Sequence, residues 1–348
     1  MLMRNSLCIK ACVFISLLIF CRGGFAMQSV PNLTNQIAAE RTPKDVGNTA
    51  HALRVLHFPL GELSLIDAKH WVDKAATARF NAIVLMIWGG VKLNSSPWAT
   101  IKYPLTPADL AEWAAYTKGK GLDVIIGVQL LSHQEFFLQE TRPELMFNHI
   151  TYDPRKAEVQ KIVFAVLDEV IDLAHPKAIH IGHDEVFNPS ELKKWRGVDE
   201  KALPAKLFLQ DVLQIHAHLK KRGVETWMWG DMLISPDEFP DMNPENLNGV
   251  IPGYGKLLRA KIPKDIVICD WHYRPSQGFP SIDTFRREGF RVMGATWENQ
   301  QTIQSFSRYA KEHNAYGMMA TIWYDALINP DKVERIIRIS GEAFANTK

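Results

Sequence analysis

Apolar residues gather in short runs that alternate with longer amphipathic stretches from residue 51 to the C-terminus. The runs are nearly uninterrupted and rich in β-branched residues, which is typical of strands buried on both faces of a parallel sheet. Eight runs have this character: 53–58, 81–88, 123–130, 178–183, 224–230, 265–271, 291–297 and 317–323.

The stretches between the runs carry helix signals. Residues 106–121 have Pro107 near their start and Gly121 past their end, the usual asymmetry of helix termini. In residues 153–175, apolar side chains recur at three- and four-residue spacing, and we expect Asp153 to be the N-cap, with Pro154 in the first turn. Residues 330–344 end the chain in the same style.

The number and order of these elements predict the fold class. Eight strand–helix units within about 300 residues match a single-domain α/β protein with the (β/α)8 TIM barrel architecture. A doubly wound open sheet is the alternative, but it normally has a glycine-rich phosphate-binding turn after its first strand. The segment "HFPLGELSL" (57–65) is not such a turn. We therefore expect residues 51–348 to form a barrel.

The first 26 residues differ from the rest of the chain. Arg4 and Lys10 precede a short apolar run, and small residues follow it up to Ala26. This pattern predicts a signal peptide over residues 1–26, cleaved near Ala26, and it predicts export to the periplasm or the medium. The apolar run is too short to favour a stable membrane anchor. Residues 27–50 form a polar lead-in to the barrel.

Charge and cysteine content narrow the classes of partner. The formal net charge is +2, and removal of the signal peptide takes away three basic residues and no acid, which leaves −1. The chain therefore lacks the excess of basic residues that would indicate nucleic acid as a partner. Three of the four cysteines lie in residues 1–26, so Cys269 would remain alone without a partner for an internal disulfide. The sequence does not fix the oligomeric state.

Candidate chemistry gathers where strands end. In a TIM barrel, catalytic residues lie at the carboxyl ends of the strands. The last four predicted strands each bring a tryptophan and an acid to that end. Any single tryptophan is commonly core packing, but four beside acids indicate a carbohydrate site, in which aromatic faces cover sugar C–H groups and carboxylates bind hydroxyls. The pairs are Trp229 with Asp231, Trp271 with Asp270, Trp297 with Glu298 and Trp323 with Asp325.

Two adjacent acids, Asp184 and Glu185, follow the fourth run. Glycoside hydrolysis needs a carboxylic acid to protonate the departing oxygen and a group that stabilises an oxocarbenium-like centre. Adjacent strand residues point to opposite sides, but at the end of a strand the chain can turn. We therefore expect both side chains to reach one pocket, with Glu185 as the acid and Asp184 as an orienting carboxylate.

These segments resemble a known family. The motif "AIHIGHDEV" (178–186) is similar to the His-x-Gly-Gly-Asp-Glu signature of family 20 glycoside hydrolases, the β-N-acetylhexosaminidases, with His183 in place of the second glycine. The first run resembles the family strand whose arginine binds sugar hydroxyls, which points to Arg54. The segment "VIIGVQLLSH" (124–133) parallels the strand that ends in an active-site histidine, here His133, but Gln129 stands in the part where the family has acids.

The resemblance implies removal of β-linked N-acetylhexosamine from an oligosaccharide or glycan by a substrate-assisted retaining mechanism, a known exception to the two-carboxylate rule. Asp184 would orient the acetamido group, and Glu185 would act as acid and then base. No metal and no cofactor are implied. The family tyrosine that touches the acetamido group has no recognisable form on the seventh strand. The expected substrate-binding residues are Arg54, His133, Trp229, Asp231, Trp271, Trp297, Glu298, Trp323 and Asp325.

Three other functions remain open. A conventional retaining glycosidase would use Asp231 or Glu298 as nucleophile. A metal-dependent barrel hydrolase would draw ligands from His180, His183, Asp184, Asp270 and His272, although the odd spacing of the first two histidines directs them to opposite sides of a strand. A non-catalytic sugar-binding barrel is favoured by the departures at Gln129 and His183 and disfavoured by the intact acid pair.

Overall fold

The computed structural model describes residues 51–98, 101–186, 201–323 and 328–346, all within the unit Thr49–Lys348. The predicted signal peptide (1–26), the lead-in (27–50) and Asp325 lie outside the described residues. Among the described helices, none is both long enough and apolar enough to cross a bilayer.

Eight parallel strands close into a barrel in chain order, with β1 paired to both β2 and β8. This confirms the predicted (β/α)8 architecture and excludes the open sheet. Each strand coincides with one of the predicted apolar runs to within one or two residues. The strands are β1 Leu53–Pro59, β2 Ala82–Met86, β3 Asp123–Leu130, β4 Ala178–Gly182, β5 Glu225–Trp229, β6 Val267–Trp271, β7 Arg291–Thr296 and β8 Gly317–Thr321.

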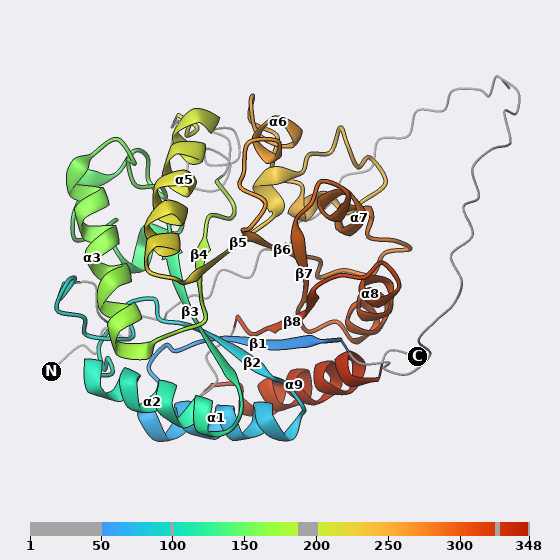
Figure 1. The fold of residues 1–348 in the computed structure, drawn as a ribbon, viewed down its shortest axis with the longest axis horizontal. Helices are drawn as coiled ribbons and strands as arrows, with labels where there is room; N and C mark the ends of the chain where they lie inside the picture. Colours follow the sequence, from blue (N-terminus) through green and yellow to red (C-terminus); the bar gives the residue numbers. More distant parts are fainter. Residues whose placement is uncertain (1–50, 99–100, 187–200, 324–327, 347–348) are drawn as a thin grey trace, which may run out of the picture. The chain divides into compact units, whose positions relative to one another are not determined.

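Helices surround the barrel and cover the outer face of its strands (Figure 1). The described helices are α1 Leu65–Thr77, α2 Pro107–Gly119, α3 Ala157–Ala174, α5 Ala205–Lys221, α6 Lys256–Arg259, α7 Pro280–Arg287, α8 Gln300–Glu312 and α9 Pro330–Ala345. Short 3-10 turns lie in the loops that follow β3 and β5: Gln134–Phe136, Pro143–Leu145, Asp231–Leu233 and Pro244–Asn246.

Local sequence explains where α1 and α2 begin. Ser64 and Thr106 are N-caps, and each forms a reciprocal capping box with the aspartate three residues later, Asp67 and Asp109. A capping box satisfies backbone N–H groups that the first helical turn leaves without partners. The local sequence therefore specifies these two helix starts.

The predicted start of α3 is wrong by three residues. The helix begins at Ala157, and Asp153 is not its N-cap. The Asp153 carboxylate instead accepts hydrogen bonds from the backbone and the guanidinium of Arg155, at 2.7 to 3.0 Å. This side-chain turn occupies the group that would otherwise cap the helix.

The core has two layers. One lies between the strands and the helices, and the other fills the interior of the barrel. On β5, Trp227 and Trp229 point into the barrel while Met228 packs outward, as the two-residue period of a strand requires. Cys269 is buried in the same interior layer, and burial raises the pKa of its thiol.

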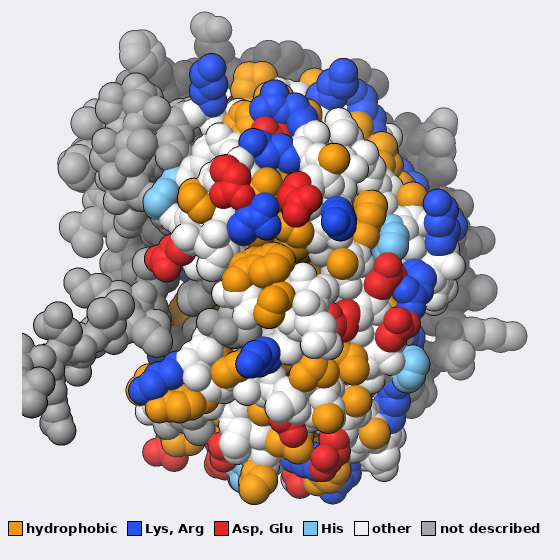
Figure 2. All heavy atoms as spheres, turned by 90° about the vertical axis from the view of Figure 1, so that its left-hand side faces the viewer, with side chains coloured by type: hydrophobic (Ala, Val, Ile, Leu, Met, Phe, Trp, Pro, Cys, Tyr) orange, Lys and Arg blue, Asp and Glu red, His pale blue; other side chains and the backbone are white. Residues whose placement is uncertain are grey.

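The surface on the α3 side of the molecule carries charges of both signs among hydrophobic side chains (Figure 2). His218 of α5 and Arg222, directly after the helix, pair with Asp168 of α3, and Arg222 also pairs with Asp172. Neighbouring helices are thus linked by ion pairs across the surface.

The capping box of α2 generates a stability prediction. Thr106→Ala removes the hydroxyl that accepts the Asp109 N–H, so the free energy of unfolding should fall by about 1 kcal/mol. Thr77→Ala, an exposed threonine inside α1, is the matched control and should change it by less than about 0.5 kcal/mol. Urea unfolding measures both, and equal losses would contradict the capping assignment.

Candidate active site

The chain leaves the strand conformation directly after β4. Gly182, His183 and Glu185 have φ values of +75°, +67° and +48°. This left-handed backbone breaks the alternation that would send Asp184 and Glu185 to opposite sides. Both carboxylates consequently face His133, whose Nε2 lies 3.6 Å from Asp184 Oδ2 and 3.3 Å from Glu185 Oε2.

His133 comes from the loop after β3 and itself has a left-handed φ of +53°. Burial opposes its charge, but the charges of Asp184 and Glu185 outweigh this effect and raise the pKa of His133 to about 10. The imidazolium therefore persists through neutral pH and lies against both carboxylates. A cation at this position balances two acids that would otherwise repel each other.

Asp184 is held by the end of β3. Its Oδ1 accepts a hydrogen bond from Gln129 Nε2 at 2.7 Å, and its backbone carbonyl accepts one from Ser132 Oγ at 2.5 Å. Burial raises the pKa of Asp184, and the His133 charge and the Gln129 hydrogen bond oppose that shift. Gln129 thus fixes the carboxylate with a neutral amide.

Asp231 lies behind the acid pair. Its Oδ2 accepts hydrogen bonds from the Glu185 N–H at 2.8 Å and from Asn248 Nδ2 at 3.0 Å, and the residue is 1% exposed. Burial, followed by the Asp184 charge, raises the pKa of Asp231 to about 7. In this geometry Asp231 holds the backbone of Glu185, which differs from the substrate contact expected from the sequence.

Three of the predicted tryptophans surround one tyrosine, Tyr273. Trp271 stacks on its ring at 4.8 Å between centroids, Trp297 meets it edge-on at 5.6 Å, and Trp323 Nε1 donates to its hydroxyl at 3.0 Å. Burial raises the pKa of Tyr273, and the charges of Asp184 and Glu185 contribute to the shift, so the hydroxyl is protonated. These side chains form an aromatic wall with a polar group in it.

Sequence reasoning missed Tyr273, Gln129 and Trp88 as candidate site residues. Trp88, two residues after β2, lies with its ring centroid 6.0 Å from that of Trp323. The available signal for Tyr273 was its place two residues after Trp271, which puts both side chains on the same side of an extended segment. Nothing in the sequence indicated that Gln129 would reach Asp184.

Trp229 is placed differently from the prediction. It is 1% exposed and lies inside the barrel, 4.4 Å from the His180 ring and 5.7 Å from the His57 ring between centroids. Its centroid is 5.9 Å from that of Trp323. Trp229 therefore supports the aromatic wall and does not offer an open face to a sugar.

The prediction for Arg54 is wrong. Arg54 lies near the start of β1, paired in register with Met318 near the start of β8, whereas the acid pair follows the end of β4. Its guanidinium donates to the backbone carbonyls of Arg79 and His51 at 2.7 and 2.6 Å. Arg54 therefore lies at the end of the barrel opposite the acid pair.

Glu298 follows β7 and forms an ion pair with Lys332 of α9 at 2.6 Å. The pair draws this carboxylate towards a helix terminus. Asp325, the acid expected after β8, lies outside the described residues.

The histidines proposed as metal ligands do not converge. His180 points into the barrel, whereas His183 points outward and contacts Asp211 of α5. His272 and Asp270 bond to each other and to Ser281. Within the described ranges, the side chains spaced closely enough to share an ion are His133, Asp184 and Glu185, whose ligand atoms lie within 4.8 Å of one another.

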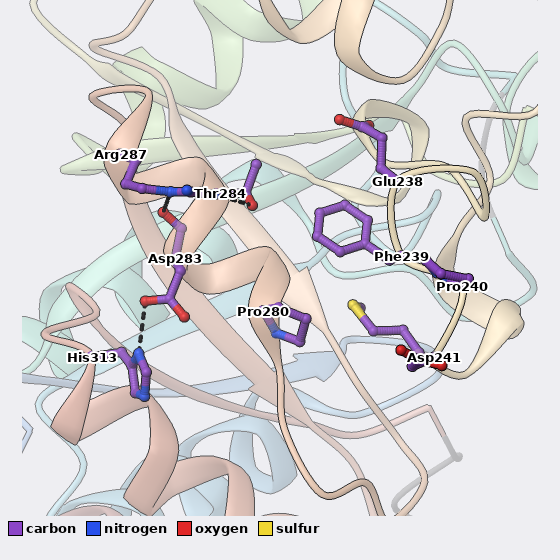
Figure 3. Close-up of a pocket in the computed structure, with 10 residues that line it drawn as sticks. Glu238, Phe239, Pro240, Asp241, Pro280, Asp283, Thr284, Arg287 and His313 are labelled. Atoms are coloured by element: carbon purple, nitrogen blue, oxygen red, sulfur yellow. Dashed lines mark hydrogen bonds and ion pairs between the residues drawn. The ribbon is translucent and has the colours of Figure 1, made fainter. Parts of the chain in front are cut away.

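One small cavity borders the site, and a larger cavity lies away from it. The small cavity, of about 30 Å³, is bordered by Trp88, Gln129 and His133, which is room for little more than a water molecule. The larger one, of about 670 Å³, lies between the loop after β5 and helix α7, where Asp283 pairs with His313 at 2.7 Å (Figure 3). None of the predicted site residues borders the larger cavity.

No family model and no curated protein matches the chain. Solved structures do. A β-N-acetylhexosaminidase from Bacteroides fragilis aligns at 16% identity and TM-score 0.61, over 84% of this chain and 65% of that one. A Flavobacterium johnsoniae chitobiase aligns at 16% and 0.63, over 85% and 48%. The chain therefore shares the barrel fold of these structures.

A mutant Streptomyces plicatus β-hexosaminidase, solved in complex with N-acetylglucosamine, has the same fold at 13% identity and TM-score 0.62, over 85% of this chain and 64% of that one. The chain thus spans between about half and two thirds of these three proteins. The expected resemblance is confirmed for the fold.

The His133 contacts predict a pH-dependent contribution to stability. Because the pKa of His133 rises from 6.5 to about 10 on folding, its proton stabilises the folded state fully below pH 6.5, and this contribution disappears as the pH approaches 10. The stability of wild type relative to His133→Gln should therefore fall between these two values.

Urea unfolding across that pH range measures the difference. Thr77→Ala, which removes no titratable group, is the control and should give a flat difference. A flat difference for His133→Gln as well would contradict the ion pairs.

Proposed function

We propose that this protein is a glycoside hydrolase that removes β-linked N-acetylhexosamine from oligosaccharides or glycans. One observation carries the proposal: Asp184 and Glu185, although adjacent, turn to the same side and meet at His133. The likeness in fold to β-N-acetylhexosaminidases supports it. A barrel that only binds sugar has no need for an acid pair held in this way.

The roles of the two acids follow from their surroundings. Glu185 is half-buried and lies 3.3 Å from His133. In its protonated form it gives its proton to the departing oxygen, and the carboxylate that results, stabilised by the His133 cation, then takes a proton from the attacking water. Asp184, fixed by Gln129, orients the acetamido N–H and balances the positive charge that develops when the acetamido carbonyl attacks the anomeric carbon. The substrate then supplies the nucleophile.

The placement of the acids favours substrate assistance over a protein nucleophile. In conventional retaining enzymes the two carboxyl groups flank the sugar. Here Asp184 and Glu185 both face His133, so they lie on one side and do not form an opposed pair. Asp231 is bonded to the Glu185 backbone and Glu298 to Lys332, so neither is directed at the same point.

The aromatic wall supplies the rest of the site. Trp271, Trp297 and Trp323 would pack against the acetamido methyl and the sugar ring, and the Tyr273 hydroxyl would donate to the acetamido carbonyl. The family tyrosine expected on the seventh strand thus has a candidate replacement at the end of β6. The proposal involves no metal and no cofactor.

The acid role of Glu185 gives the functional test. Glu185→Gln removes general acid catalysis, so hydrolysis of N-acetylglucosaminides with poor leaving groups should slow by about 10²- to 10⁴-fold. Substrates with good leaving groups, such as p-nitrophenol, need little protonation and should lose much less.

Steady-state kinetics over a series of aryl leaving groups measures this dependence. Glu334→Gln, which changes an α9 glutamate paired with Lys74, is the matched control and should keep wild-type rates. Equal losses for good and poor leaving groups would remove Glu185 from the acid role.

A further inference from the structure

His183 carries a side chain where backbone geometry favours glycine. Its φ of +67° falls in the left-handed region, between Gly182 at +75° and the acid pair. Such a conformation is strained for a residue with a bulky side chain and persists only where surrounding contacts enforce it. The family signature has glycine here, which adopts this conformation freely.

The His183 ring is fixed at both ends. It is fully buried, with Nδ1 3.0 Å from the backbone oxygen of Ile181 and Nε2 3.0 Å from Asp211 Oδ2. The ring also meets Phe208 edge-on, at 5.5 Å between centroids. Asp211 and Phe208 both belong to α5, so the histidine ties the end of β4 to a helix outside the barrel.

Asp211 is in turn tied to the loop after β3. Its Oδ2 accepts a hydrogen bond from the Tyr152 hydroxyl at 2.7 Å. Burial and the charge of Asp211 raise the pKa of Tyr152, which keeps the hydroxyl protonated and donating. The Tyr152 N–H donates to Leu131, next to Ser132, which holds the backbone of Asp184. The network therefore returns to the acid pair from a second direction.

Asp211 is a buried carboxylate whose charge is tolerated because it has hydrogen-bond partners. Asp211 is 3% exposed, and an unpaired charge at that depth is costly. Both of its described partners, His183 and Tyr152, have no contact with the acid side chains themselves. The cluster thus acts on the site only through the backbone at residues 182–185.

We infer that His183, with Asp211 and Tyr152, is a positioning residue that locks the left-handed turn after β4 and so sets the direction of Asp184 and Glu185 toward His133. A glycine would permit the turn, whereas the histidine enforces it. The expected loss of activity rests on the proposed function. The expected change in the pKa of His133 rests on geometry alone.

His183→Gly is the direct test, because glycine tolerates the same φ and removes only the anchor. We expect kcat for p-nitrophenyl N-acetylglucosaminide to fall by up to about 10²-fold, the scale of a misplacement near 1 Å, with little change in KM. Added imidazole should restore part of the rate by filling the space beside Asp211. Asp211→Asn, which preserves shape, should lower kcat in the same direction.

His216→Ala is the matched control, since His216 is also a buried histidine but contacts Thr226 and Asp265. It should leave kcat unchanged. A kcat of His183→Gly equal to that of wild type, or an equal loss in His216→Ala, would overturn the inference.

A second readout does not depend on activity. NMR titration of isotope-labelled histidines should show the pKa of His133 falling in His183→Gly and in Asp211→Asn, because its two carboxylate partners are no longer aimed at it. An unchanged His133 pKa would reject the anchor. An inactive wild-type enzyme would reject the proposed function, and this titration would still decide the inference.

Discussion

Two adjacent residues of an extended strand point away from each other, so bringing Asp184 and Glu185 to one histidine requires the backbone to leave the strand conformation. The left-handed turn at the end of β4 does this. His133 then supplies the charge that makes two neighbouring carboxylates tolerable in a partly buried place. The remaining features of the site, from Gln129 to Asp231, hold these three groups in position.

The barrel interior below the site is kept neutral. Burial lowers the pKa of His57 to about 3 and lowers the pKa of His180 well below its ordinary value, so both rings are uncharged. They pack against Trp229, which underlies Trp323. Charge is thus concentrated at the mouth, where low surrounding polarity strengthens its interaction with a substrate.

The barrel could be predicted from the sequence because each strand is buried on both faces. Such strands appear in the sequence as nearly uninterrupted apolar runs. The acid pair was also visible, since few structural roles place two adjacent acids after a buried strand. The backbone turn that makes them converge was not visible, because His183 is a residue that seldom adopts a left-handed φ and does so here through contacts with a helix 28 residues later.

The errors have physical causes. Arg54 belongs to a predicted strand, but a pattern of apolar residues does not tell which end of the strand faces the mouth. The alternation of side chains along β5 places Trp229 inside the barrel, but how deeply it is buried there depends on how far β5 extends. Gln129 and Tyr273 reach the site through packing between strands, which a local pattern does not contain.

The central claim is that the acetamido group of the substrate, and no carboxylate of the protein, attacks the anomeric carbon. Rates for p-nitrophenyl glucosaminides whose N-acetyl group carries none, one, two or three fluorine atoms test it directly. Fluorine withdraws electrons from the carbonyl oxygen and weakens it as a nucleophile, so kcat/KM should fall steeply with each atom added. A rate independent of fluorination, as expected with Asp231 or Glu298 as nucleophile, would contradict the account.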